Sequence, residues 1–101
     1  MTRKVVFSPE AEADLNSLYD HIVESAGSAR ALIYSERIAR FCINLSNFSE
    51  RGVRRDDLRA GLRIIGFERR ATIAFHITAD SVTIDRILYG GRDLGNNLRV
   101  K

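Results

Sequence analysis

The sequence predicts an α+β protein with the element order β-α-α-β-β-β, in which a helical hairpin packs on a mainly antiparallel four-stranded sheet. Two apolar stripes of helical spacing occupy the first half of the chain, and three short runs rich in β-branched and aromatic residues follow in the second half. No internal repeat, low-complexity segment or linker separates them. Residues 1–101 are therefore expected to form a single domain.

The first strand is expected at Arg3–Phe7, a β-rich run that stops at a helix-start signal. Ser8 can cap the N-terminus of a helix, and Pro9 suits the first helical position. The first helix is therefore expected from Pro9 to Gly27, where the glycine ends it. Its apolar stripe consists of Ala11, Leu15, Leu18, Ile22, Val23 and Ala26.

A second helix is expected directly afterwards, with Ser28 as its candidate cap. Its stripe continues to Phe48 through Ala31, Tyr34, Ile38, Phe41, Cys42 and Leu45. Cys42 is the only cysteine, and its place in this stripe favours a buried core residue. Because so few residues join the two helices, they should form an antiparallel hairpin.

The rest of the chain should supply an antiparallel meander. Ser49–Gly61 has no sustained period and is interpreted as a surface connection with one helical turn around Asp56–Leu58. Strands are then expected at Leu62–Phe67, Ala71–Thr78 and Ser81–Tyr89, separated by short polar turns.

The last of these strands has an irregular pattern. Val82 and Ile84 should face one side of the sheet, and Thr83 and Asp85 the other. Arg86 then falls on the apolar side. Either a β-bulge interrupts the strand or a charged group points inward.

Charge is unevenly distributed along the chain. The net charge is +3, but residues 1–50 hold five basic and seven acidic residues, whereas residues 51–101 hold eleven basic and six acidic ones. Fourteen of the sixteen basic residues are arginine, whose planar guanidinium suits contacts with carboxylates or phosphates. An acidic partner is implied. No apolar run approaches the roughly 20 residues that span a bilayer, and no signal peptide is evident, so a cytoplasmic protein without membrane contact is expected.

Several enzyme classes lack their motifs in this sequence. There is no glycine-rich phosphate loop, no Cys/His spacing for zinc and no G-x-S-x-G stretch. The two histidines, His21 and His76, are interpreted as structural or surface residues. We therefore expect no metal and no cofactor.

The remaining candidates are arginines and one tyrosine. Arg51, Arg54 and Arg55 are interpreted as a solvated charge run. The constellation also includes Arg59, Arg63, Arg86 and Arg92, with Tyr89 among them. Arg63, Arg86 and Arg92 lie in or directly after the predicted strands, where a rigid scaffold can hold a guanidinium in place. A binding role and an internal ion pair with Asp85 or Asp93 both remain open for the strand arginines.

The helices carry more apolar residues than one packed face requires. Tyr19 lies off the stripe of the first helix, and Leu32, Ile33 and Ile43 lie off that of the second. They either widen the core contact or form an exposed patch that a partner helix could cover.

These features together resemble the ParE branch of the RelE/ParE toxins of bacterial type II toxin-antitoxin systems. The resemblance covers essentially the whole chain and is carried by the element order and by the stretches "FSPEAEADLNSLYDHI", "LRAGLR" and "VTIDRILYGGRDL". It implies a small toxin held inactive in a hetero-oligomeric complex by a cognate ParD-like antitoxin. The antitoxin's C-terminal segment would wrap the helical hairpin and the sheet.

ParE-like toxins inhibit DNA gyrase and so block replication, and they are not hydrolases. The resemblance thus implies a protein that acts by binding, without sequence-specific contacts to DNA. Its target-binding residues would be Arg59, Arg63, Arg86, Tyr89 and Arg92. Its antitoxin-binding residues would be Tyr19, Leu32, Ile33, Ile43, Arg63 and Arg86.

Two alternatives remain. RelE-like relatives of the same fold cleave mRNA in the ribosomal A site, and here Arg63, Arg86 and Tyr89 could clamp the phosphorane and transfer a proton. Lysine occurs only at positions 4 and 101, which departs from the lysine-rich surface of that branch and favours a gyrase inhibitor. Tyr89 stands where many ParE-like sequences have histidine, which leaves the target open. The second alternative is a non-toxic remnant that only binds the antitoxin.

Overall fold

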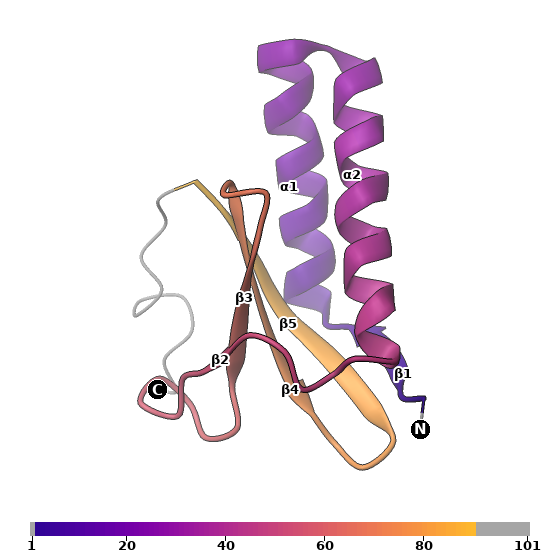
Figure 1. Cartoon of the computed structure of the whole chain (residues 1–101). Helices are drawn as coiled ribbons and strands as arrows, with labels where there is room; N and C mark the ends of the chain where they lie inside the picture. The colour runs from indigo at the N-terminus through magenta and orange to yellow at the C-terminus, as the bar shows by residue number, and fades with distance from the viewer. Residues whose placement is uncertain (1, 91–101) are drawn as a thin grey trace.

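A computed structural model describes residues 2–90 as two layers, a helical hairpin over one face of a five-stranded sheet (Figure 1). The α+β class is confirmed, and the sheet has one strand more than predicted. In chain order the elements are β1 (Lys4–Phe7), α1 (Pro9–Ala26), α2 (Ser28–Ile43), a short 3₁₀ helix (Asn44–Ser46), β2 (Val53–Arg54), β3 (Arg63–Phe67), β4 (Ala71–Ile77) and β5 (Ser81–Tyr89).

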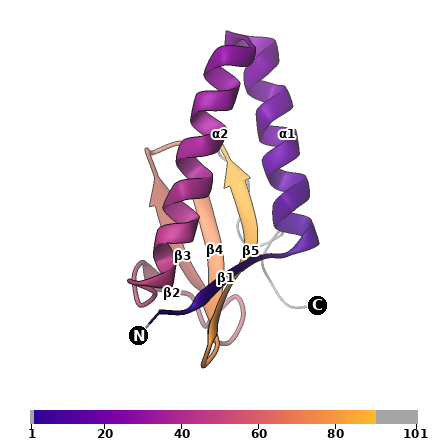
Figure 2. The same cartoon turned by 90° about the vertical axis from the view of Figure 1, so that its right-hand side faces the viewer.

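The strand order in the sheet is β1-β5-β4-β3-β2. β3, β4 and β5 form the predicted antiparallel meander. β1 lies parallel to β5, from Lys4 opposite Ser81 to Phe7 opposite Ile84. Because β1 ends beside the middle of β5, the first turns of α1 start at the free edge of β5 (Figure 2).

The additional strand, β2, lies within the segment that was expected to be a plain surface connection. Val53 pairs with Ile64 and Arg54 with Arg63, at the far edge of the sheet. Gly52 precedes this strand with φ 77°, and a Cβ atom there would lie 2.3 Å from the backbone oxygen of Ile64. The close approach of two backbones, rather than strand propensity, therefore creates β2.

α1 begins as predicted. The side-chain oxygen of Ser8 accepts a hydrogen bond from the backbone N–H of Ala11 at 3.0 Å, and Pro9 occupies the first helical position. Gly27 ends the helix with φ 92°, a conformation that favours glycine. It also occupies the N-cap position of α2, so Ser28 lies inside that helix and does not cap it.

α2 is shorter than expected. It ends at Ile43, and the 3₁₀ helix Asn44–Ser46 follows. The chain changes direction after α2. Ser49 stabilises this change by donating a hydrogen bond of 2.6 Å to the backbone oxygen of Leu45. Asn and Ser side chains compete with helical backbone bonding, which accounts for the early end. Phe48, expected on the buried stripe, is 68% exposed.

The β3–β4 turn has an unusual backbone. Glu68 and Arg69 both have positive φ, 51° and 60°. Tight hairpins of this kind usually place glycine or asparagine at such positions, because other residues are strained there. The turn carries Glu68 and Arg70 to the end of the sheet that faces the hairpin.

Hydrophobic residues form two cores, one on each face of the sheet. The main core lies between the hairpin and the sheet and includes Cys42, whose predicted burial is confirmed. The second, smaller core lies on the opposite face, where Leu58 and Leu62 of the 55–62 segment cover Ala74 and Leu88. The segment after β2 is thus packed on the sheet, and its backbone makes one turn in which Arg55 accepts from the N–H groups of Leu58 and Arg59.

Candidate functional site

A β-bulge divides β5 and sets the direction of its side chains. Phe75 of β4 stands opposite Ile84, and Ala74 stands opposite Arg86, so Asp85 is the extra residue. Ile84 packs in the main core before the bulge, and Ile87 packs in the same core after it. Of the two alternatives that the sequence left open, the structure shows the bulge, which shifts the alternation by one residue.

Arg86 is held by Asp14 of α1. Its Nε and Nη2 atoms donate hydrogen bonds of 2.7 and 2.9 Å to the two carboxylate oxygens, and the side chain of Asp14 is 8% exposed. This bidentate bond raises the pKa of Arg86 above its usual value. An internal ion pair was one of the two expectations for Arg86. Among the described residues its partner is Asp14 rather than the expected Asp85, and Asp93 lies outside the described residues.

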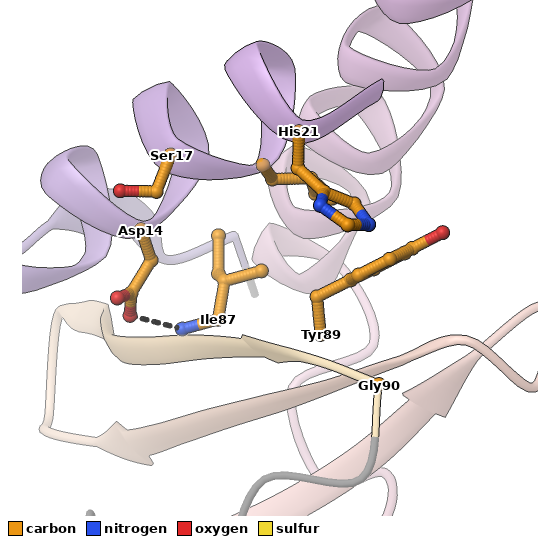
Figure 3. A pocket seen from close by; sticks show the side chains of 7 residues that line it. Asp14, Ser17, His21, Ile87, Tyr89 and Gly90 are labelled. Atoms are coloured by element: carbon orange, nitrogen blue, oxygen red, sulfur yellow. Dashed lines mark hydrogen bonds between the residues drawn. The ribbon is translucent and has the colours of Figure 1, made fainter. Parts of the chain in front are cut away.

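Asp14 also replaces part of a strand. Beyond the end of β1, no strand among residues 2–90 lies next to the edge of β5, and the backbone N–H of Ile87 donates to Asp14 at 2.9 Å (Figure 3). The hydroxyl of Ser8, which caps α1, donates to the backbone oxygen of Asp85 at 2.9 Å. The start of α1 thus supplies the hydrogen bonds that β1 no longer provides.

A recess of about 320 Å³ lies between α1 and the end of β5 (Figure 3). Asp14, Ser17 and His21 line it from α1, and Ile87 and Tyr89 line it from β5. The ring of Tyr89 makes an edge contact with His21, at 5.5 Å between ring centres. Tyr89 therefore faces the hairpin and is half-buried beneath it.

The proposed ribonuclease residues are not gathered at one point. Arg63 stands opposite Phe75, and Tyr89 stands opposite Ala71, four residues further along β4. That is roughly 13 Å along the strand at about 3.3 Å per residue. Arg63 donates to the backbone oxygen of Arg51 at 3.4 Å, while Arg86 is engaged by Asp14. The fifth predicted target-binding residue, Arg92, lies outside the described residues.

Arg59 lies on the face of the sheet opposite the hairpin, in a cluster that the sequence did not predict. Its Nη2 atom is 2.8 Å from Oδ2 of Asp85, and Nδ1 of His76 is 2.7 Å from the same oxygen. The cluster fixes the 55–62 segment to the sheet. His76 is thus a structural histidine, as expected. The alternation of polar and apolar residues along β4 could indicate this role, because it places His76 on the polar face of the strand.

The arginines after β2 are paired within their own segment. Arg54 makes two hydrogen bonds of 3.1 Å to Asp56, and Arg55 makes two of 2.9 Å to Asp57. These pairs are solvent-exposed, in agreement with the interpretation of a solvated charge run. Their charge is largely neutralised locally.

The helical hairpin does expose an apolar patch. Leu32, Ile33 and Ile43 are 53%, 57% and 55% exposed. Tyr19, predicted to join them, is partly buried and packs against the main core. Phe48 and Val53 are exposed apolar residues that sequence reasoning did not single out, since the first was assigned to the core and the second to a loop.

Comparisons with known proteins agree with this architecture. Residues 5–94 match the family described as the ParE toxin of the type II toxin-antitoxin system parDE. A solved structure of the chromosomal ParDE system from P. aeruginosa shares 26% identity with a TM-score of 0.77, and the match covers 88% of this chain and 97% of that one. The RelBE2 toxin-antitoxin complex from Mycobacterium tuberculosis gives 19% identity and a TM-score of 0.63, over 88% of this chain and 99% of that one. No curated protein matches the chain.

The fold and the family match define a small α+β toxin of the RelE/ParE superfamily. The chain belongs to the ParE toxin family of type II toxin-antitoxin systems. Among residues 2–90, neither helix has the length and apolar character needed to cross a membrane.

Proposed function

We propose that this toxin acts by binding DNA gyrase and so stops replication, and that a cognate ParD-like antitoxin neutralises it. The main support for this proposal is that Arg63 and Tyr89 lie roughly 13 Å apart along the direction of β4, while Arg86 is hydrogen-bonded to Asp14. A phosphoryl-transfer centre needs its groups held around one reacting phosphate. The separation of Arg63 and Tyr89 therefore supports a toxin that inhibits its target by surface contacts, rather than an enzyme that cleaves RNA.

The antitoxin part of the proposal is supported by the exposed patch on α2 and by the structural relatives. Leu32, Ile33 and Ile43 are all more than half exposed, and exposed apolar side chains gathered on one element favour a protein partner. The similar P. aeruginosa structure is a ParDE toxin-antitoxin system. Binding of a ParD-like segment would cover this patch on the hairpin.

A supercoiling assay with purified gyrase tests the target. Added at roughly stoichiometric amounts, the toxin should inhibit supercoiling or accumulate cleaved DNA, and premixed antitoxin should restore activity. A reaction with topoisomerase I serves as the control and should be unaffected. If gyrase keeps full activity with no cleaved DNA, the gyrase proposal is wrong.

Expression in a bacterial host without the antitoxin separates the alternatives. Growth arrest that the antitoxin relieves is expected, and normal growth would instead indicate the non-toxic remnant. Primer extension on translated mRNA during the arrest should show no new cleavage sites. Codon-specific cleavage would instead establish the RelE-like activity and would require residues beyond the dispersed Arg63, Arg86 and Tyr89.

A further inference from the structure

The helical hairpin extends past the end of the sheet (Figure 1). A second recess lies beneath this overhang. Its volume is about 530 Å³. Ile33 and Tyr34 of α2 and Tyr89 of β5 contribute apolar walls. Arg30 of α2 and Arg70 of the turn between β3 and β4 contribute positive charges at the rim. The recess thus combines apolar walls with excess positive charge.

The hydroxyl of Tyr34 is a buried polar group without a partner. Tyr34 is 8% exposed, and its hydroxyl oxygen has no hydrogen-bond partner among the described residues. Its ring is fixed by edge contacts with Phe67 and Tyr89, at 5.7 and 6.1 Å between ring centres. A buried hydroxyl left unbonded in a folded chain costs free energy, and such exceptions often mark a function.

This hydroxyl is available as a donor at physiological pH. Burial, followed by the neighbouring Tyr89, raises the pKa of Tyr34 from 10.0 to about 12. The group therefore stays protonated and neutral. A neutral phenol beside cations can donate its proton to an anionic oxygen.

The charges around the hydroxyl are not balanced. Arg37 forms an ion pair with Glu68 across the recess. Neither Arg30 nor Arg70 has a carboxylate partner within residues 2–90, in contrast to the paired arginines after β2. The recess therefore carries an excess of positive charge.

We infer that this recess binds a carboxylate side chain of an acidic antitoxin segment, with the Tyr34 hydroxyl as hydrogen-bond donor and Arg30 and Arg70 as counter-charges. The inference rests on the proposed antitoxin partner. An apolar residue next to that carboxylate in the segment would pack on Ile33, which is 57% exposed at the rim. The recess thereby continues the apolar patch of α2 and adds specificity to it.

The shape of the recess favours a peptide over a nucleic acid. A nucleic-acid strand needs a row of cations along its phosphates, and stacking aromatic faces. Here the cations surround one recess with apolar walls, Glu68 adds a negative charge at the rim, and the rings of Tyr34 and Tyr89 meet edge to face. A single carboxylate followed by an apolar side chain fits this arrangement.

Binding requires a small rearrangement, because the hydroxyl is shielded from solvent in the free chain. Arg37 lies near it, and its side chain is 53% exposed. A rotamer change there opens the way, and the entering carboxylate can compete with Glu68 for the guanidinium.

Titration calorimetry with the antitoxin encoded beside the toxin gene tests the inference. The variants are Tyr34→Phe and Arg70→Gln, with Arg69→Gln as the matched control outside the recess. Each recess variant should weaken binding about tenfold, because each removes one partner of a charge-assisted hydrogen bond or ion pair. The control should stay within about twofold of the wild type. Thermal melting should show that Tyr34→Phe remains folded.

A carboxylate scan of the antitoxin identifies the occupant. One Asp→Asn or Glu→Gln change should weaken binding about tenfold and should add little to Arg70→Gln in a double-mutant cycle. If the wild type binds the antitoxin but the recess variants bind equally well, the inference is wrong and the proposed function stands. If the wild type does not bind the antitoxin, the proposed partner itself is wrong. If the variants lose affinity only for a labelled oligonucleotide, the recess is an anion site for nucleic acid and the inference is overturned.

Discussion

Asp14 and Arg86, from the second turn of α1 and the middle of β5, are joined by two parallel hydrogen bonds across 72 positions of sequence. The same carboxylate accepts the backbone N–H of Ile87. One side chain therefore holds the helical layer and the sheet together at the point where β1 ends. Its contribution to stability can be measured directly.

Asp14→Asn should lower the free energy of unfolding by about 3 kcal/mol, because it removes the carboxylate charge that pairs with the half-buried Arg86 guanidinium. Urea denaturation measures the change. Asp20→Asn is the control, since Asp20 is an exposed acid on the same helix, and it should change stability by no more than about 0.5 kcal/mol. Equal effects of the two substitutions would contradict a structural role of the Asp14–Arg86 pair.

Tyr34→Phe should raise the free energy of unfolding of the free toxin by about 1 kcal/mol, because it removes a buried hydroxyl that has no hydrogen-bond partner within residues 2–90. Together with the weaker antitoxin binding expected above, this separates a binding role from a structural one. Thermal or urea unfolding of the two proteins at neutral pH provides the measurement. A clear loss of stability would show that the hydroxyl is satisfied in the free chain.

Alkaline pH should destabilise the wild type through the same residue. The pKa of Tyr34 is about 12 in the folded chain and 10.0 as the ordinary value, so the folded state keeps a proton that the unfolded state releases. This contribution is complete below about pH 10 and is lost as the pH rises towards about 12. Unfolding curves across that interval should fall more steeply for the wild type than for Tyr34→Phe. Cys42, whose pKa burial also raises to about 12, affects both proteins alike.

Gly52→Ala should disrupt the pairing of β2 with β3. The new Cβ would lie 2.3 Å from the backbone oxygen of Ile64, and the residue has φ 77°. A loss of about 3 kcal/mol is expected from overpacking and backbone strain together. Gly61→Ala measures the backbone strain alone, because Gly61 also has φ 77° but no atom lies within 4 Å of a Cβ added there. This substitution should lower the stability by about 1 kcal/mol. If both substitutions lower the stability by similar amounts, β2 can move away from β3 to make room for the new Cβ without a cost in free energy.

Leu32→Ser tests the exposed patch of α2. Leu32 is 53% exposed, so the substitution should change the stability of the free toxin by no more than about 0.5 kcal/mol. It should weaken antitoxin binding about tenfold if the patch is an interface anchor. Phe48→Ser removes an apolar side chain that is 68% exposed and lies outside α2, and it is the control for antitoxin affinity. A larger loss from Phe48→Ser would move the interface to the other end of α2.

The elements that local chemistry determines could be predicted from the sequence. The cap at Ser8 and the first part of the α1 stripe each depend on neighbouring residues, and both are present in the structure. Val23 and Ala26, expected at the end of that stripe, are exposed. The bulge in β5 was one of two alternatives that the sequence left open, because a charged residue broke an alternating pattern. The family was also recognisable from motifs spread over the whole chain.

What could not be predicted depends on contacts between distant segments. The partner of Arg86 is set by the parallel pairing of β1 with β5, which brings α1 to that edge, and no local pattern reveals it. β2 arises from a close approach at Gly52 and has only two residues. The grouping of Arg30, Arg70 and Tyr34 follows from the overhang of the hairpin, which depends on where the sheet ends.

The carboxylate of Asp14 has one more consequence, which concerns self-association. An open strand edge offers unpaired backbone groups to any second chain, and natural proteins guard such edges with charged side chains. Here Asp14 occupies the N–H of Ile87 and places a negative charge beside the edge. Replacing Asp14 by uncharged residues should therefore lower both the folding stability and the solubility of the protein. Oligomers that pair edge to edge through β5 should form as this side chain is removed.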